Sequence, residues 1–189
     1  MFQINKLDHI NIIVDDIDEA LNFYQNLLGA EKIHIFPHFK NVGFAQSAGF
    51  LNNPDKVDVT MAYLKIPNTE TRIELFCFHN PEGNTTIQYI KTNDLGGTRH
   101  VCLQVDDIHA AFKFIKGCEG VTLINQSPEY KPHKIDKITT SQFKYFDAAL
   151  ENDAKKKQDI ADLVAETSFF YFIDRYGVQW EFESAPSVP

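Results

Sequence analysis

Two stretches of the chain repeat one pattern, HINIIVDDIDEALNFY at residues 9–24 and HVCLQVDDIHAAFKFI at residues 100–115. Both contain VDDI, and in both a histidine stands five residues before the valine: His9 in the first copy and His100 in the second. Matching residues of the two copies are always 91 positions apart, from His9 and His100 to Phe23 and Phe114. A constant shift over such a length indicates an internal duplication.

Each copy predicts a strand followed by a helix. Apolar and β-branched residues lead up to VDDI, and apolar residues at spacings of three and four follow it. The aspartates suit the positive N-terminal end of a helix, and Gly29 and Gly117 suit its C-terminal end. Further strands are predicted at 31–40, 57–66 and 71–78, and at 121–126, 168–174 and 178–184. Both halves therefore have the order βαβββ, with a loop predicted at 41–56.

The second half contains an insertion, at about 127–167, that the first half lacks. Within it, residues 141–166 predict a helix, because apolar side chains recur among charged ones. The sequence thus predicts an α+β fold class. Residues 1–189 are expected to form a single domain of two modules, at 5–80 and 97–184, with a helical insertion in the second.

The composition excludes several classes of partner. The net charge of −8 and the pI of about 5.3 give no general attraction to nucleic acid or to anionic membranes. Cys77, Cys102 and Cys118 are odd in number and widely spaced, which is typical of free thiols in a reducing compartment. No stretch approaches the roughly 20 apolar residues of a membrane helix, and no signal peptide is recognised. We expect a cytoplasmic protein with a small-molecule substrate.

Strand alternation places four titratable residues on the strand faces opposite the apolar ones. In each of four predicted strands an apolar set takes one face, and one titratable residue sits mid-strand on the other. These residues are His9 and Glu74 in the first half and His100 and Glu181 in the second. They lie on the first and last strand of each half, so a curved duplicated sheet would bring them together.

Two imidazoles and two carboxylates are a suitable ligand set for a divalent first-row metal. A single histidine or glutamate on a strand is more often a surface or hydrogen-bonded residue. The placement of the same two residue types in both halves favours one shared site for one divalent ion, which would also neutralise the two carboxylates. Its identity stays open among Ni, Co, Zn, Mn and Fe(II).

These stretches resemble the vicinal oxygen chelate superfamily, also called the glyoxalase/bleomycin resistance protein/dioxygenase family. LDHINIIVDDIDEALNFYQNLLG is similar to the family's opening strand and helix, GGTRHVCLQVDDIHAAFKFI to its second-half opening, and FIDRYGVQWEFE to its closing hairpin. The resemblance implies two βαβββ modules that form a curved eight-stranded mixed sheet around a metal cleft. It implies His9, Glu74, His100 and Glu181 as the metal ligands, and a homodimer.

The resemblance leaves several reactions open. A glyoxalase-type lyase or isomerase would move a proton through an enediolate-type intermediate, with Glu74 or Glu181 as the catalytic base. RIELFCFHNPEGNTTIQYIKTNDLGGTRHVCLQVDDI is similar to methylmalonyl-CoA epimerases. An extradiol-type Fe(II) dioxygenase needs only two histidines and one carboxylate, and a resistance protein would bind a small molecule without chemistry. Arg72, Phe76 and Arg99 are the expected substrate-binding residues.

Overall fold

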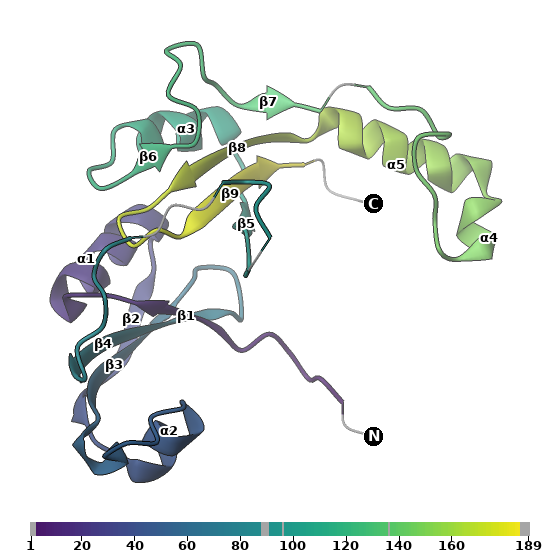
Figure 1. The fold of residues 1–189 in the computed structure, drawn as a ribbon. Helices are drawn as coiled ribbons and strands as arrows, with labels where there is room; N and C mark the ends of the chain where they lie inside the picture. Colours follow the sequence, from purple (N-terminus) through teal and green to yellow (C-terminus); the bar gives the residue numbers. More distant parts are fainter. Residues whose placement is uncertain (1–2, 88–90, 96, 136, 186–189) are drawn as a thin grey trace. The chain divides into compact units, whose positions relative to one another are not determined.

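Strand pairing in the computed structural model stays within each of two compact units, Met1–Gln88 and Tyr89–Pro189. The structure describes residues 3–87, 91–95, 97–135 and 137–185 (Figure 1). The described strands form a four-stranded sheet in the first unit and a five-stranded sheet in the second. The predicted α+β class is confirmed, although the strands form two sheets where the family resemblance implied one of eight strands.

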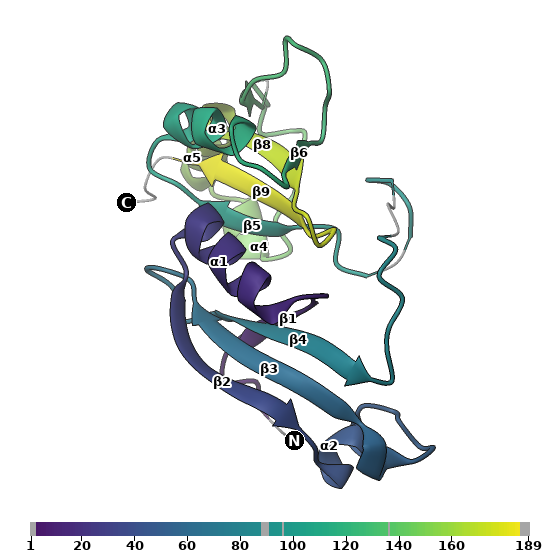
Figure 2. The same cartoon turned by 90° about the vertical axis from the view of Figure 1, so that its left-hand side faces the viewer.

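The first unit is built on a four-stranded sheet. Its strands are β1 (His9–Ile13), β2 (Glu31–Phe39), β3 (Asp58–Lys65) and β4 (Arg72–Asn80), in the order β1-β4-β3-β2. β1 runs parallel to β4, and the other pairs are antiparallel. Helix α1 (Ile17–Leu28) lies along one face of this sheet (Figure 2) and buries Ala20, Leu21, Tyr24 and Leu27. The opposite face is the one on which His9 and Glu74 were predicted.

The second unit has the same topology. Its strands are β5 (Val101–Gln104), β6 (Thr122–Leu123), β8 (Ser168–Ile173) and β9 (Gln179–Ser184), in the order β5-β9-β8-β6, with β5 parallel to β9. Helix α3 (Ile108–Lys116) follows β5 as α1 follows β1. The VDDI copies begin the two helices in the same way, because Asp16 caps α1 and Asp107 caps α3 through their side chains.

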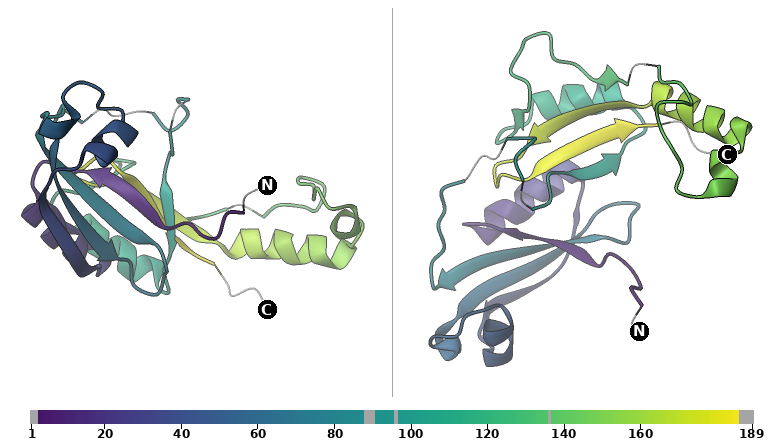
Figure 3. Two further views of the ribbon diagram at one scale, coloured as in Figure 1. Left: turned by 90° about the horizontal axis from the view of Figure 1, so that it is seen from below. Right: turned by 45° about the vertical axis from the view of Figure 1, so that its right-hand side comes forward.

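The insertion adds a short strand and two helices to the second unit. β7 (His133–Lys134) pairs with β8, and α4 (Ala148–Glu151) and α5 (Ala154–Glu166) follow it. Helix α5 leads directly into β8 and lies beyond the end of that strand (Figure 3). The helical prediction for 141–166 holds from residue 148 onward. The residues before it are not helical, although their apolar side chains fit the pattern.

Two further sequence predictions for the local structure were wrong. The stretch 41–56, predicted as a loop, contains α2 (Val42–Ser47) and a 3₁₀ turn (Pro54–Lys56). Asn41 caps α2 by accepting a hydrogen bond from the backbone N–H of Phe44. A helix of six residues is too short to show an apolar period. Of the residues predicted as a strand at 121–126, only Thr122 and Leu123 pair with β8 and form a strand, β6.

Candidate functional site

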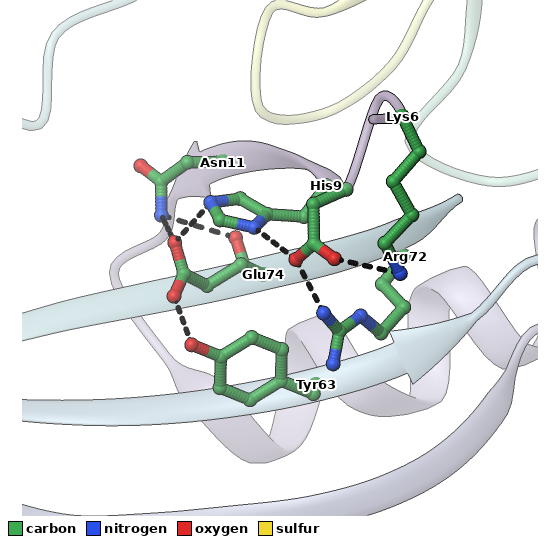
Figure 4. A network of polar contacts seen from close by, with 7 residues as sticks. Lys6, His9, Asn11, Tyr63, Arg72 and Glu74 are labelled. Atoms are coloured by element: carbon green, nitrogen blue, oxygen red, sulfur yellow. Dashed lines mark hydrogen bonds and ion pairs between the residues drawn. The ribbon is translucent and has the colours of Figure 1, made fainter. Parts of the chain in front are cut away.

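His9 and Glu74 come together within the first unit. Glu74 lies on β4 directly beside Asn11 of β1, two residues after His9. The His9 imidazole reaches along the sheet face, so that its Nε2 lies 3.2 Å from Glu74 Oε2 (Figure 4). The Glu74 residue is 7% exposed, so this carboxylate is largely removed from water. The structure thus pairs the two ligands that the sequence predicted for the first half.

Two neutral donors hold the Glu74 carboxylate in addition to His9. Asn11 Nδ2 donates to Glu74 Oε2 at 3.1 Å, and the hydroxyl of Tyr63 donates to Oε1 (Figure 4). Tyr63 lies on β3 directly opposite Glu74. Burial, and then the hydrogen bond to Glu74, raises the pKa of Tyr63 to about 12. Tyr63 therefore stays a hydrogen-bond donor at neutral pH and fixes the orientation of the carboxylate.

The second unit repeats this arrangement. His100 precedes β5, and its Nε2 lies 2.9 Å from Oε2 of Glu181 on β9. Tyr171 of β8 lies directly opposite Glu181 in the sheet, and its ring centroid is 5.4 Å from that of His100. Burial, and then a hydrogen bond to Glu181, raises the pKa of Tyr171 to about 12. Each unit therefore carries one set of histidine, glutamate and tyrosine.

The two tyrosines were not predicted as site residues. From the sequence, neither Tyr63 nor Tyr171 was given a role. A signal was present in the two hairpins, because a turn fixes which residues of its flanking strands face each other. Tyr63 and Glu74 lie equally far from the turn centre at Asn68–Thr69, and Tyr171 and Glu181 each lie five residues from Tyr176. Centring the turns would have paired each tyrosine with its glutamate.

The chemistry of the first pair fits a cation. His9 Nδ1 lies 3.1 Å from Asp8 Oδ2, and hydrogen bonds from His9, Lys6 and Arg72 hold the pKa of Asp8 well below its usual range. When Nδ1–H donates to this carboxylate, Nε2 presents its lone pair to Glu74. Two acceptors 3.2 Å apart need a proton or a cation between them. Two atoms that bind the same metal ion through bonds of about 2.0–2.2 Å lie about as far apart as Nε2 of His9 and Oε2 of Glu74 do here.

The three expected substrate-binding residues have different surroundings. Arg72 forms an ion pair with Asp8, and its guanidinium lies 5.6 Å from the centre of the Tyr63 ring. Phe76 packs against Phe78 with ring centroids 6.0 Å apart. Arg99 donates from Nη1 to the carbonyl of Lys91, while its buried Nε has no hydrogen-bond partner in the described part of the chain. Arg99 thus retains a donor that a ligand could use.

A thiol also lies close to Glu181. Cys102 pairs with Glu181 across β5 and β9, and the possible ligand atoms of Cys102, Glu181 and Glu183 lie within 4.8 Å of one another. Burial, followed by the charges of Glu181 and Glu183, raises the pKa of Cys102 to about 12. Without an ion, Cys102 therefore stays in the thiol form, whereas metal ligation uses the thiolate. The sequence did not predict Cys102 as a ligand, and the proposal below does not include it.

Loss of the Tyr63 hydroxyl tests this arrangement in the first unit. The Y63F variant is expected to lose about 1.5–3 kcal/mol of unfolding free energy, because a hydrogen bond to a largely buried carboxylate disappears. Denaturant unfolding of metal-free protein measures the change. Y145F is a matched control, since the hydroxyl of Tyr145 donates a long hydrogen bond of 3.4 Å to the carbonyl oxygen of Lys156 and not to a carboxylate. Equal stability of the two variants would contradict the role of Tyr63.

Two units of one topology, each with a histidine at the start of its first strand or directly before it and a glutamate on its last strand, define a duplicated fold of the glyoxalase type. The chain belongs to the Glyoxalase/Bleomycin resistance protein/Dioxygenase superfamily, whose family model matches residues 6–129. The family resemblance seen in the sequence is thereby confirmed. Members of this superfamily bind small-molecule substrates and commonly a divalent metal.

Curated relatives of the chain are epimerases. It is 33% identical over 132 residues to an ethylmalonyl-CoA/methylmalonyl-CoA epimerase of Cereibacter sphaeroides, covering 69% of this chain and 83% of that protein. It is 30% identical over 135 residues to the mitochondrial methylmalonyl-CoA epimerase of Dictyostelium discoideum, covering 69% and 66%. The match to the human mitochondrial enzyme, at 26% identity, spans 61% of this chain and 55% of that protein.

Solved structures share the fold at lower identity. A glyoxalase family protein from Bacillus cereus has a TM-score of 0.66 at 16% identity, and the match covers 98% of this chain and 97% of that protein. The fosfomycin resistance protein FosX from Listeria monocytogenes, solved with Mn(II) and sulfate, has a TM-score of 0.52 at 16% identity, with coverage of 97% and 95%. Among the described residues, no helix is long and apolar enough to cross a membrane.

Proposed function

We propose that the chain is a metal-dependent isomerase that moves a proton at a carbon next to a carbonyl group, and that it epimerises an acyl-CoA thioester of the methylmalonyl-CoA kind. One observation carries the chemistry: each unit holds a glutamate whose carboxylate lies beside a histidine and accepts a hydrogen bond from a tyrosine. The substrate class rests on the epimerases to which the chain is similar.

The proposed metal ligands are His9 and Glu74 of the first unit and His100 and Glu181 of the second. The donor set of two imidazoles and two carboxylates suits a divalent first-row ion. Such an ion, when bound, would polarise the two carbonyl oxygens of the substrate and so make the proton on the carbon between them easier to remove. Nickel, cobalt, zinc, manganese and iron(II) are all compatible with these ligands.

The glutamates are the proposed catalytic residues. Epimerisation requires a base that takes the proton from one face of the carbon and an acid that returns it on the other. The chain offers two carboxylates for these roles, Glu74 and Glu181, each supported by a tyrosine that keeps its own proton. The Nε–H of Arg99, which has no hydrogen-bond partner among the described residues, supports a role in binding the substrate carboxylate. We propose the same role for Arg72, and contact with an apolar part of the substrate for Phe76.

Proton exchange tests this function. Metal-loaded protein is incubated with methylmalonyl-CoA in D₂O, and the methine proton is followed by NMR. We expect this signal to disappear while the molecule is otherwise unchanged, and a single stereoisomer to become a mixture. Consumption of O₂ with a catechol would favour the dioxygenase alternative. Tight binding of the thioester without exchange, by metal-loaded and folded protein, would contradict an enzyme of this kind.

The assembly and the domain limits are part of the same proposal. We predict a homodimer, which sedimentation would distinguish from a monomer. We also predict that residues 5–80 and 97–184 act as the two modules of one domain. Expression of either module alone is therefore expected to give a protein without exchange activity.

A further inference from the structure

A second group of metal-ligating side chains lies in the first unit, away from Glu74. It consists of His38 on β2, Asp58 and Thr60 on β3, and His79 on β4. One possible ligand atom from each of His38, Asp58 and His79 lies within 4.8 Å of the others. Side chains alternate along β3, so Asp58 and Thr60 point to the face opposite Tyr63 and Glu74. The group is therefore separate from the proposed catalytic residues.

Two β-bulges bring the histidines to this position. Phe36 and Phe39 of β2 pair with Met61 and Val59, so the segment containing His38 has one residue more than the facing part of β3. On the other side, Asp58 pairs with Asn80 and Val59 with Phe78, which leaves His79 as the extra residue of β4. A bulge re-aims a side chain and is common at functional sites. Here one bulge flanks β3 on each side.

The four side chains contact one another closely. His38 Nδ1 lies 3.1 Å from Asp58 Oδ1, and the imidazole rings of His38 and His79 have centroids 4.6 Å apart. The Thr60 hydroxyl lies 2.8 Å from His79 Nε2 and 3.4 Å from the backbone N of His38. His38 also has a φ of 50°, in the left-handed region that residues with a Cβ seldom adopt. The fold holds His38 in this conformation against its backbone preference.

The charge balance leaves Asp58 available as a ligand. Lys40 Nζ lies 3.3 Å from Asp58 Oδ2. Burial raises the pKa of Asp58, but hydrogen bonds from His38 and Lys40 outweigh this effect and lower it, so the carboxylate stays ionised at neutral pH. The His38 side chain is 66% exposed and that of Asp58 is 13% exposed. An ion could thus enter from solvent and keep water molecules on its open side.

From this geometry we infer that His38, Asp58 and His79 bind a divalent transition-metal ion, with the Thr60 hydroxyl orienting the His79 ring. Two imidazoles and one carboxylate are ligands that zinc and its first-row neighbours prefer. Such an ion would join the edge strand β2 to β4 across β3. The simpler reading is that Lys40 and His38 only neutralise Asp58, and this reading predicts no bound ion.

Zinc binding to metal-stripped, full-length protein separates the two readings. Equilibrium dialysis gives the zinc bound per chain for the wild type, for H38Q/H79Q and for the control H109Q, which replaces an exposed histidine on α3. We expect H38Q/H79Q to bind one ion fewer than the wild type and H109Q to bind the same number. Proton exchange by H38Q/H79Q should stay at the wild-type rate. Equal zinc binding by all three proteins would overturn the inference.

NMR of the wild type covers the case in which the double variant does not fold. The imidazole ¹⁵N resonances of His38 and His79 are assigned from single variants and followed during a zinc chloride titration. We expect both to shift together and then to saturate. Resonances that stay unchanged while zinc binds elsewhere on the protein would also overturn the inference.

Discussion

Replacing Glu181 by glutamine (E181Q) is expected to lower the rate of α-proton exchange in methylmalonyl-CoA by about 10³-fold, within the range that a positioned acid or base contributes. Glutamine keeps the shape of the side chain and can still accept a hydrogen bond from Tyr171. It lacks the basic carboxylate that would take the proton and the negative charge that would hold the ion. The rate is measured by NMR with metal-saturated protein in D₂O.

The matched control for this variant is E183Q. Glu183 lies two residues further along β9, on the same face, and is also half-buried. Within the described part of the chain Glu183 forms no ion pair with a histidine, so E183Q should exchange protons at nearly the wild-type rate. If the two variants were equally active, or equally impaired with intact fold and metal content, Glu181 would have no special role in the reaction.

Removing the metal is expected to reduce exchange by at least about 100-fold, because the substrate oxygens lose their electrostatic stabilisation. Protein is dialysed against a chelator, assayed, and assayed again after addition of cobalt, manganese, nickel, zinc or iron(II). At least one of these ions should restore the rate. Magnesium should not, since it prefers oxygen ligands to imidazole.

Two further results complete the metal-removal test. Far-UV circular dichroism of the stripped protein should match that of the loaded protein, because backbone strand pairing and buried apolar side chains hold each sheet together. H38Q/H79Q serves as the control variant and should lose and regain activity as the wild type does. Full activity in protein shown to contain no metal would contradict a metal-dependent reaction.

The local pattern of the sequence predicted much of the fold. The repeated VDDI located both helix starts, because Asp16 and Asp107 are N-caps whose side chains satisfy backbone N–H groups nearby in sequence. Alternation along β1 and β4 placed His9 and Glu74 on one face, and the structure pairs them. These features depend on neighbours within a few residues, which sequence periodicity records.

Other features depend on contacts between distant residues. The bulges at His38 and His79 arise from how β2 and β4 pair with β3. Pro37 marks the first bulge in the sequence, but no short pattern in β4 records the second. One edge of β8 is shared by two short strands, because β6 pairs with its end and β7, from the insertion, pairs with its beginning. The tyrosines beside Glu74 and Glu181 are an intermediate case. Hairpin turns set their register, so the sequence contained the signal, but only when strands were considered in pairs.

The central claim is that His9 and His100 bind the same ion, and a count of bound metal in H9A, H100A and H9A/H100A tests it most directly. If the two histidines share one ion, each single variant should lose one bound ion relative to the wild type, and the double variant should also lose only one. If each histidine binds an ion of its own, the double variant would lose two, which would contradict the claim. A folded double variant that loses none would contradict it as well.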